Sequence, residues 1–189
     1  MEPVVDSNEA MHCEYISTIL HTALSLLKGL IITPQMKITS EINTGRVDYA
    51  IKKILDDLLE EIICINRIKQ LWVSAKTQCR SACDMNINIS KKKRKVDEAF
   101  NSDNEYIYGI VSTDTDWHFI LYSTEGIYST SRIEYQISLI EDALKDDTEL
   151  CKNVKRVLEV IVSLLKDRAL GSEKPATKKC CVEEIIKKK

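Results

Sequence analysis

The sequence has 189 residues, 44% of them hydrophobic and 30% charged, which suits one globular domain with a sizeable core. The apolar run ALSLLKGLII is interrupted by Lys28 and Gly29, and the acidic start MEPVVDSNEA has no apolar core. We therefore expect neither a membrane span nor a secretory signal. Seven cysteines, an odd number, favour reduced thiols in an intracellular protein over a disulfide framework.

The net charge of −2 is unevenly distributed along the chain. Residues 91–95 (KKKRK) carry five positive charges, and residues 171–189 hold six lysines against three glutamates. The remaining residues must then carry a net charge of −10. Because phosphate neutralisation dominates nucleic-acid affinity, this acidic body predicts a poor general platform for nucleic acid.

The first half of the chain predicts a helix, a hairpin, a buried strand and a second helix. Residues 8–30 place apolar side chains at helical spacing. Alternating residues around the turn signal NTG, in MKITSEINTGRVDYAIKK, predict a β-hairpin. Residues 61–69 form a nearly continuous apolar run, which is typical of a central strand buried on both faces. Residues 71–85 predict a weakly patterned helix.

The second half begins with residues 86–105, which are polar and lysine-rich and predict a mobile surface loop. Three predicted strands follow: YIYGIVSTD, WHFILYS and a segment near RIEYQISL. Apolar residues at helical spacing predict a last helix that ends near Arg168. Residues 171–189 have too little apolar surface to fold and predict a disordered basic tail. The order predicts a single α/β domain over residues 1–170, with a mixed sheet flanked by helices.

A candidate metal site combines Asp48 of the hairpin with the cations at the end of the buried strand. In metal-dependent nucleases, two carboxylates hold Mg²⁺ while a lysine of a Glu-x-Lys pattern steadies the attacking water. Here that pattern reads Arg67-Ile68-Lys69. A positive unit charge about 4 Å from a divalent cation, at an effective dielectric constant of about 20, repels the cation by several kcal/mol. Residues two apart on a strand share a face, so Arg67 and Lys69 should point one way and Asn66 the other.

Glu41 is the candidate for a second acid. If residues 44–45 form a two-residue turn, Glu41 lies opposite Asp48 with the Cβ atoms about 5 Å apart; a three-residue loop would shift this register. We hypothesise that Arg67 and Lys69 neutralise the two carboxylates, so that a salt-bridge cluster replaces the metal. The pattern leaves a second interpretation open, an aspartate at a strand end beside a solvated cationic strand terminus.

Six segments resemble a group of poorly characterised proteins abundant in arbuscular-mycorrhizal fungi: SEINTGRVDYAI, IICINRIK, the Q-C-x-S helix, SKKKRKVDEAF, YIYGIVSTDTDWHFILYSTEGI and CKNVKRVLEVIVSLLKDR. The resemblance covers roughly residues 35–170. It implies a PD-(D/E)xK restriction-endonuclease-like core related to crinkler-type, secreted or nuclear effector-like proteins. Members commonly have I-T-E-x-K at residues 65–69, so the resemblance carries over Asp48 and Lys69 and makes Arg67 a departure. It implies a degenerate member of that group.

The run KKKRKV resembles a monopartite nuclear localisation signal, whose cations are Lys91, Lys92, Lys93, Arg94 and Lys95. Such signals are read in an extended form, so this interpretation requires an exposed, flexible loop. It predicts a nuclear location and a nuclear import receptor as a partner. The alternatives are a merely solvated loop, or a loop that contacts phosphates through Lys91, Lys92 and Arg94.

Cys79 and Cys83 lie four residues apart on a predicted helix, but no C-x-x-C or H-x-x-x-H motif accompanies them, so zinc is not expected. We predict a nuclear, catalytically inactive nuclease-like domain that needs no cofactor and binds nucleic acid or a nuclear protein. One alternative is an active Mg²⁺- or Mn²⁺-dependent nuclease that uses Asp48, Glu41 and Lys69. Another is a protein-interaction module whose acidic body is the contact surface.

Overall fold

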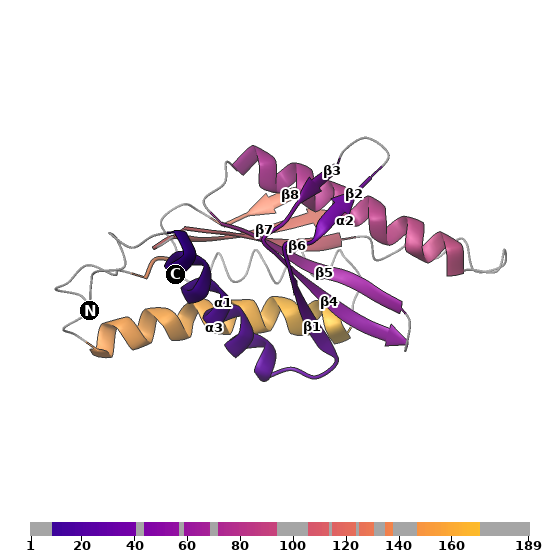
Figure 1. Ribbon diagram of the computed structural model, residues 1–189. Helices are drawn as coiled ribbons and strands as arrows, with labels where there is room; N and C mark the ends of the chain where they lie inside the picture. Colours follow the sequence, from indigo (N-terminus) through magenta and orange to yellow (C-terminus); the bar gives the residue numbers. More distant parts are fainter. Residues whose placement is uncertain are drawn as a thin grey trace.

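The chain folds around a six-stranded mixed sheet with helices on both faces (Figure 1). The computed structural model describes residues 9–40, 44–56, 59–68, 72–93, 106–113, 115–123, 125–130, 135–137 and 147–170. Helices α1 and α3 pack together on one face of the sheet, and α2 covers the other face together with the small sheet of β2 and β3.

The elements in chain order are α1 (Glu9–Ser25), β1 (Leu30–Pro34), β2 (Lys37–Thr39), β3 (Thr44–Arg46), β4 (Tyr49–Asp56), β5 (Leu59–Ile68), α2 (Trp72–Lys93), β6 (Tyr106–Ser112), β7 (Trp117–Ser123), β8 (Gly126–Ser129) and α3 (Asp147–Leu170). The large sheet has the order β1-β4-β5-β6-β7-β8. Only its β5–β6 pair is parallel, and α2 is the crossover between these two strands, because a parallel pair cannot be joined by a tight turn. The predicted α/β class, a mixed sheet flanked by helices, is confirmed.

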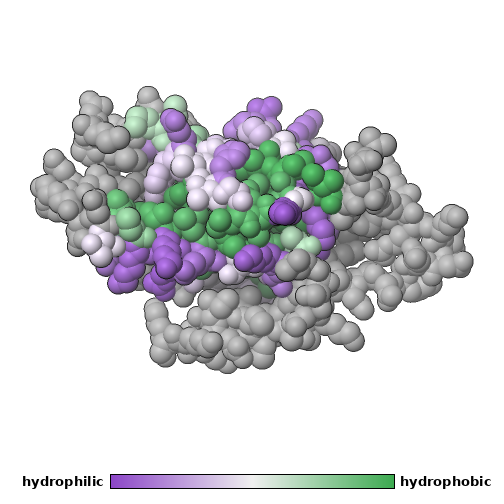
Figure 2. Space-filling view, turned by 90° about the horizontal axis from the view of Figure 1, so that it is seen from below, coloured by the Kyte–Doolittle hydropathy of each residue, from purple (hydrophilic) through white to green (hydrophobic). Residues whose placement is uncertain are grey.

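The sheet separates two apolar layers. On the α1 and α3 side, a row of α3 residues points inward and is fully buried: Val157, Ile161 and Leu165. A second row, Val154, Leu158 and Val162, is half-buried, and Figure 2 shows apolar residues as a band across this side of the molecule. On the other side, Cys79, Ala82 and Cys83 of α2 pack on buried residues of β4, β5 and β6.

Gly109 of β6 permits the close approach of α2. A Cβ atom at this position would lie 2.6 Å from the Cys79 Sγ atom, which is closer than real side chains come. The two thiols of α2 are therefore core residues, and burial raises the pKa of Cys79 to about 12.

Two strands differ from the prediction. The residues after α1 were expected only to end the helix, but Gly29, with a φ of 74°, turns the chain so that Leu30–Pro34 pairs antiparallel with β4. The third late strand was expected near RIEYQISL, of which the structure describes only residues 135–137; the strand β8, Gly126–Ser129, which pairs with β7 in a tight hairpin, was not predicted. Residues 135–137 contribute only a bridge between Asp116 and Gln136.

Helix α2 is longer than predicted, because residues 86–93, expected in a loop, are helical. The Asn86 side chain accepts a hydrogen bond from the Ile62 N–H (3.1 Å) and donates one to the Ile62 carbonyl (2.6 Å), which ties this part of the helix to β5. Residues 94–105 and 171–189 lie outside the described residues.

Within the described residues, no helix has the length and apolar character needed to cross a membrane.

Candidate functional site

The register of the β2–β3 hairpin differs from the prediction. Lys37 pairs with Arg46 and Thr39 with Thr44, so four residues connect the two strands and Thr44 and Gly45 belong to a strand instead of a turn. The expected pairing of Glu41 with Asp48 is therefore wrong. The residue that faces Asp48 is Gln35, whose N–H donates to the Asp48 carbonyl (2.8 Å).

Asp48 lies where the hairpin joins the large sheet, and both of its carboxylate oxygens face polar groups. Oδ2 accepts a hydrogen bond from the Ile68 N–H at 2.8 Å. Oδ1 is 3.5 Å from Gln35 Nε2 and 3.8 Å from Arg67 Nη1. These contacts fix the orientation of the carboxylate. The Asp48 side chain is 21% exposed, so the carboxylate is still partly accessible to solvent.

Arg67 points to the α2 side of β5, and its side chain is only 10% exposed. Its Nη1 donates to the Arg46 carbonyl, which also accepts a hydrogen bond from Gln78 Nε2 of α2 at 3.2 Å. The guanidinium thus joins β5 to the hairpin and to Asp48. One cation holds three segments of the chain together, because its planar group has several donors in fixed directions.

Asn66 points to the opposite face of β5, in keeping with strand alternation. Its Nδ2 donates to Ser112 Oγ (3.0 Å), on the side of α1 and α3. The structure thus brings Asp48 and Arg67 together and leaves Asn66 outside the site. Lys69 and Glu41 lie outside the described residues.

The described residues do not suit a divalent metal at Asp48. Mg²⁺ prefers several oxygen ligands, whereas the described part of the chain offers no group of three or more acids, histidines and cysteines. The space beside Oδ1 is within 3.8 Å of a guanidinium, and Oδ2 is engaged by a backbone N–H. Charge repulsion from Arg67 opposes cation binding at this carboxylate.

The α2 layer, defined here as α2 with the β2–β3 hairpin, concentrates positive charge. The described residues of α2, β2 and β3 contain seven lysines and arginines and one acid, Asp84, although the whole chain has a net charge of −2; Glu41, in the connection between β2 and β3, lies outside the described residues. Lys37 and Arg46, paired in register on the hairpin, are exposed, and so is Arg80 of α2. Lys91, Lys92 and Lys93 form the end of the helix, while Arg94 and Lys95 lie outside the described residues.

Three residues of the site were missed by sequence reasoning: Gln35, Arg46 and Gln78. Gln35 has a positive φ of 50°, which costs a non-glycine residue about 1 kcal/mol or more. The sequence carries no signal for this conformation, since Gln35 simply follows Pro34. Arg46 contributes its backbone carbonyl, which is invisible in a residue pattern.

No family model and no curated protein matches the chain. Among solved structures, the type IIG restriction endonuclease BpuSI is similar, with a TM-score of 0.45 and 14% identity over 91% of this chain. The match spans only 18% of the BpuSI chain. This likeness to a restriction endonuclease concerns the fold, and it carries no conclusion about activity. A relation to fungal or crinkler-type proteins stays a prediction.

Proposed function

We propose that the chain is a nuclease-like domain without hydrolytic activity, which binds nucleic acid through the α2 layer and acts in the nucleus. The observation that carries this proposal is the Arg67 guanidinium, 3.8 Å from the Asp48 carboxylate and almost fully buried. A cation that the fold holds beside the carboxylate opposes metal binding at that carboxylate.

Binding is supported by the distribution of charge, which the net charge of the chain conceals. Lys37 and Arg46 are exposed side by side on the hairpin, and Arg80 is exposed on α2. Arg67 and Gln78 fix the Arg46 carbonyl, so the hairpin has a defined position relative to α2. Exposed cations on one layer suit the contacts to phosphate that supply most nucleic-acid affinity.

Nuclear action is supported by residues 91–95, which would be read by a nuclear import receptor. Lys91, Lys92 and Lys93 form the last turn of α2, so the receptor must bind after this turn has opened. Helix ends fray readily, which keeps such opening accessible. A fluorescent fusion should accumulate in nuclei, and alanines at residues 91–95 should abolish this. Equal distribution of both fusions would contradict the nuclear proposal.

Binding is tested with labelled duplex and single-stranded DNA and RNA over a series of salt concentrations. The variant K37A/R46A/R80A should lower the slope of log affinity against log salt by about 2–3 for a duplex, because it removes three phosphate contacts. The matched control K152A/K155A/K166A removes three lysines of α3 on the other side of the sheet and should leave the slope unchanged. No binding by the parent chain would favour a protein-interaction module.

The proposed lack of hydrolytic activity and of metal binding at Asp48 is tested with the parent chain and the Arg67→Glu variant, each with EDTA, Mg²⁺ or Mn²⁺. The parent should not cleave nucleic acid, and metal should leave its Tm unchanged. Arg67→Glu places two carboxylates together, so Mg²⁺ or Mn²⁺ should raise the Tm of this variant. Cleavage by the parent that is lost with EDTA and with Asp48→Ala would show an active nuclease, with Glu41 and Lys69 as its further candidate residues.

A further inference from the structure

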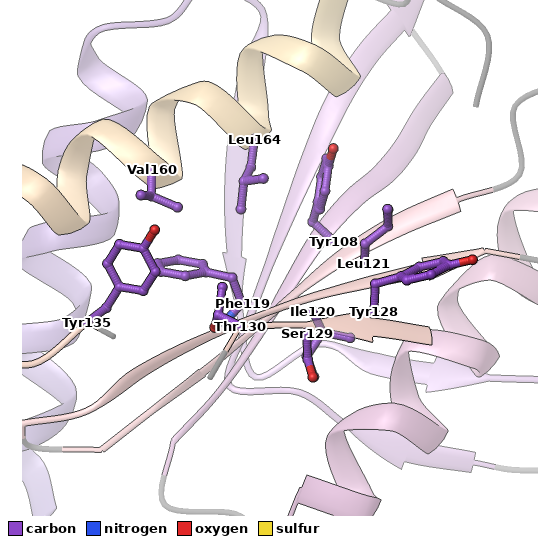
Figure 3. A pocket seen from close by; sticks show the side chains of 10 residues that line it. All are labelled: Tyr108, Phe119, Ile120, Leu121, Tyr128, Ser129, Thr130, Tyr135, Val160 and Leu164. Carbon is purple, nitrogen blue, oxygen red and sulfur yellow. Dashed lines mark hydrogen bonds between the residues drawn. The ribbon is translucent and has the colours of Figure 1, made fainter. Parts of the chain in front are cut away.

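An apolar hollow opens between α3 and the last two strands of the sheet (Figure 3). Its volume is about 50 Å³, several times the roughly 10–15 Å³ that one water needs. Val160 and Leu164 of α3 form one wall, and Leu121 and Tyr128 of β7 and β8 form another. The hollow is thus suited to an aliphatic side chain that enters from outside.

The sheet ends beside this hollow. Among the described residues, no strand pairs with the outer edge of β8. The Thr130 N–H donates to the Phe119 carbonyl (3.1 Å), so by alternation the N–H groups of Ile127 and Ser129 point away from β7. Ile127 is 42% exposed. An added strand is accepted by two features together: backbone donors that no described strand engages, and an apolar hollow beside them.

Residues 171–189 supply a strand of suitable chemistry and reach. The segment CVEEIIK, residues 181–187, contains all the valine and isoleucine of this part of the chain. The eleven residues from 171 to 181 span up to about 36 Å when extended. Leu170 lies about 21 Å from Arg156 along the helix axis, at a rise of about 1.5 Å per residue. These eleven residues are therefore long enough to return along α3 to Arg156, which contacts Tyr135 at one end of the hollow.

The order of charges selects an antiparallel orientation. The Arg156 guanidinium is 5.0 Å from the centre of the Tyr135 ring, at the end of the hollow that follows β8. Glu125 is exposed at the start of β8. An antiparallel strand brings Glu183 and Glu184 toward Arg156 and the lysines after residue 186 toward Glu125. A parallel strand would oppose like charges at both ends.

We propose that residues 181–187 add to the outer edge of β8 as an antiparallel strand and place one isoleucine in the hollow. This segment is too poor in apolar residues to fold alone, but backbone pairing with β8 and the existing hollow supply what it lacks. The inference does not depend on the proposed function, because it concerns the opposite end of the sheet from Asp48.

The test is amide hydrogen exchange on the full chain, resolved by residue. The Ile127 and Ser129 amides should exchange at least about tenfold more slowly than in the variant that disrupts docking. Ile185→Asp and Ile186→Asp are matched controls for each other, because neighbouring residues of a strand face opposite sides. One of the two changes should speed amide exchange at Ile127 and Ser129, and the other should leave the exchange rates nearly unchanged. Arg156→Glu should weaken protection, and adding E183K/E184K should restore it.

Fast exchange at Ile127 and Ser129 in the parent chain would overturn the proposal. So would protection that survives both isoleucine changes, since the edge would then be covered by something else. Protection that rises with protein concentration would assign the edge to a second copy of the chain and equally reject the tail as its occupant. The Tyr128 amide, which points toward β7, reports in every variant whether the hairpin itself is intact.

Discussion

Strand β5 carries an arginine–carboxylate pair near each of its ends, and the two pairs are equally exposed. Arg67 with Asp48 and Arg168 with Glu61 both combine an arginine side chain that is 10% exposed with an acid that is 21% or 22% exposed. Their contacts differ. Arg168 Nη2 donates directly to Glu61, and its guanidinium lies 4.9 Å from the centre of the Tyr106 ring. Arg67 instead donates to a backbone carbonyl, and its carboxylate partner is 3.8 Å away.

The surroundings of the two pairs explain this difference. Next to Arg168, Asp167 accepts hydrogen bonds from the hydroxyls of Tyr106 and Tyr108, both at 2.9 Å, so the end of α3 is fastened to β6. Asp48 has one strong hydrogen bond, from a backbone N–H. Equal burial therefore does not imply equal roles: the Glu61 pair holds the end of a helix in place, whereas the Asp48 pair keeps a partly exposed carboxylate beside a cation.

The largest effect should follow from Arg168→Ala. The change leaves Glu61 without its partner and removes packing on Tyr106, so it should lower the free energy of unfolding by about 3 kcal/mol. Chemical denaturation measures this, with Lys166→Ala, an exposed neighbour on α3, as the control that should stay within about 0.5 kcal/mol. A loss no larger than that of the control would remove the distinction between the two pairs.

Arg67→Ala should cost less, about 1–2 kcal/mol, because the Arg46 carbonyl keeps its hydrogen bond from Gln78 and Asp48 keeps the Ile68 N–H. The same denaturation experiment measures it, and Arg80→Ala is the exposed control. A cost equal to that of Arg168→Ala would show that the Asp48 pair is also an anchor.

Alkaline pH should selectively reduce the stability that comes from the contacts of Asp167 and Arg168 at the end of α3. Burial, followed by the charge of Asp167, raises the pKa of Tyr106 and Tyr108 above the ordinary value of 10. Groups with a raised pKa in the folded state give stability that is complete below pH 10 and is lost as pH rises through the folded pKa. The double variant Y106F/Y108F should lose about 1 kcal/mol per hydroxyl at neutral pH and show a smaller decline above about pH 10. An unchanged decline would assign the alkaline loss to other groups.

The smallest effect is expected for the pair between Lys52 and Glu60, which joins β4 to β5 at 2.7 Å. Because Glu60 is 44% exposed, solvent screens the attraction, and Lys52→Ala should cost about 0.2–1 kcal/mol. The loss should fall further in high salt. A salt-independent cost above about 2 kcal/mol would show that short distance outweighs exposure in this sheet.

Local pattern predicted much of the fold. The apolar run of residues 61–69 became a central strand that is buried from Ile62 to Ile68, and the spacing around Val157 and Ile161 became α3. Periodicity succeeds there because long elements bury one face or both. It failed at β1, where five residues after Gly29 are too short for a pattern, and it missed β8, which has only four residues.

The amino-acid sequence by itself determined that a mixed α/β domain forms, and that Arg67 is a cation near the end of the central buried strand. Only the tertiary structure decided what faces Asp48. The register of β2 and β3 placed Gln35 there instead of Glu41, and the packing of α2 brought Gln78 to the Arg46 carbonyl. These contacts depend on loop length and helix placement, which many distant interactions fix together, so no local pattern encodes them.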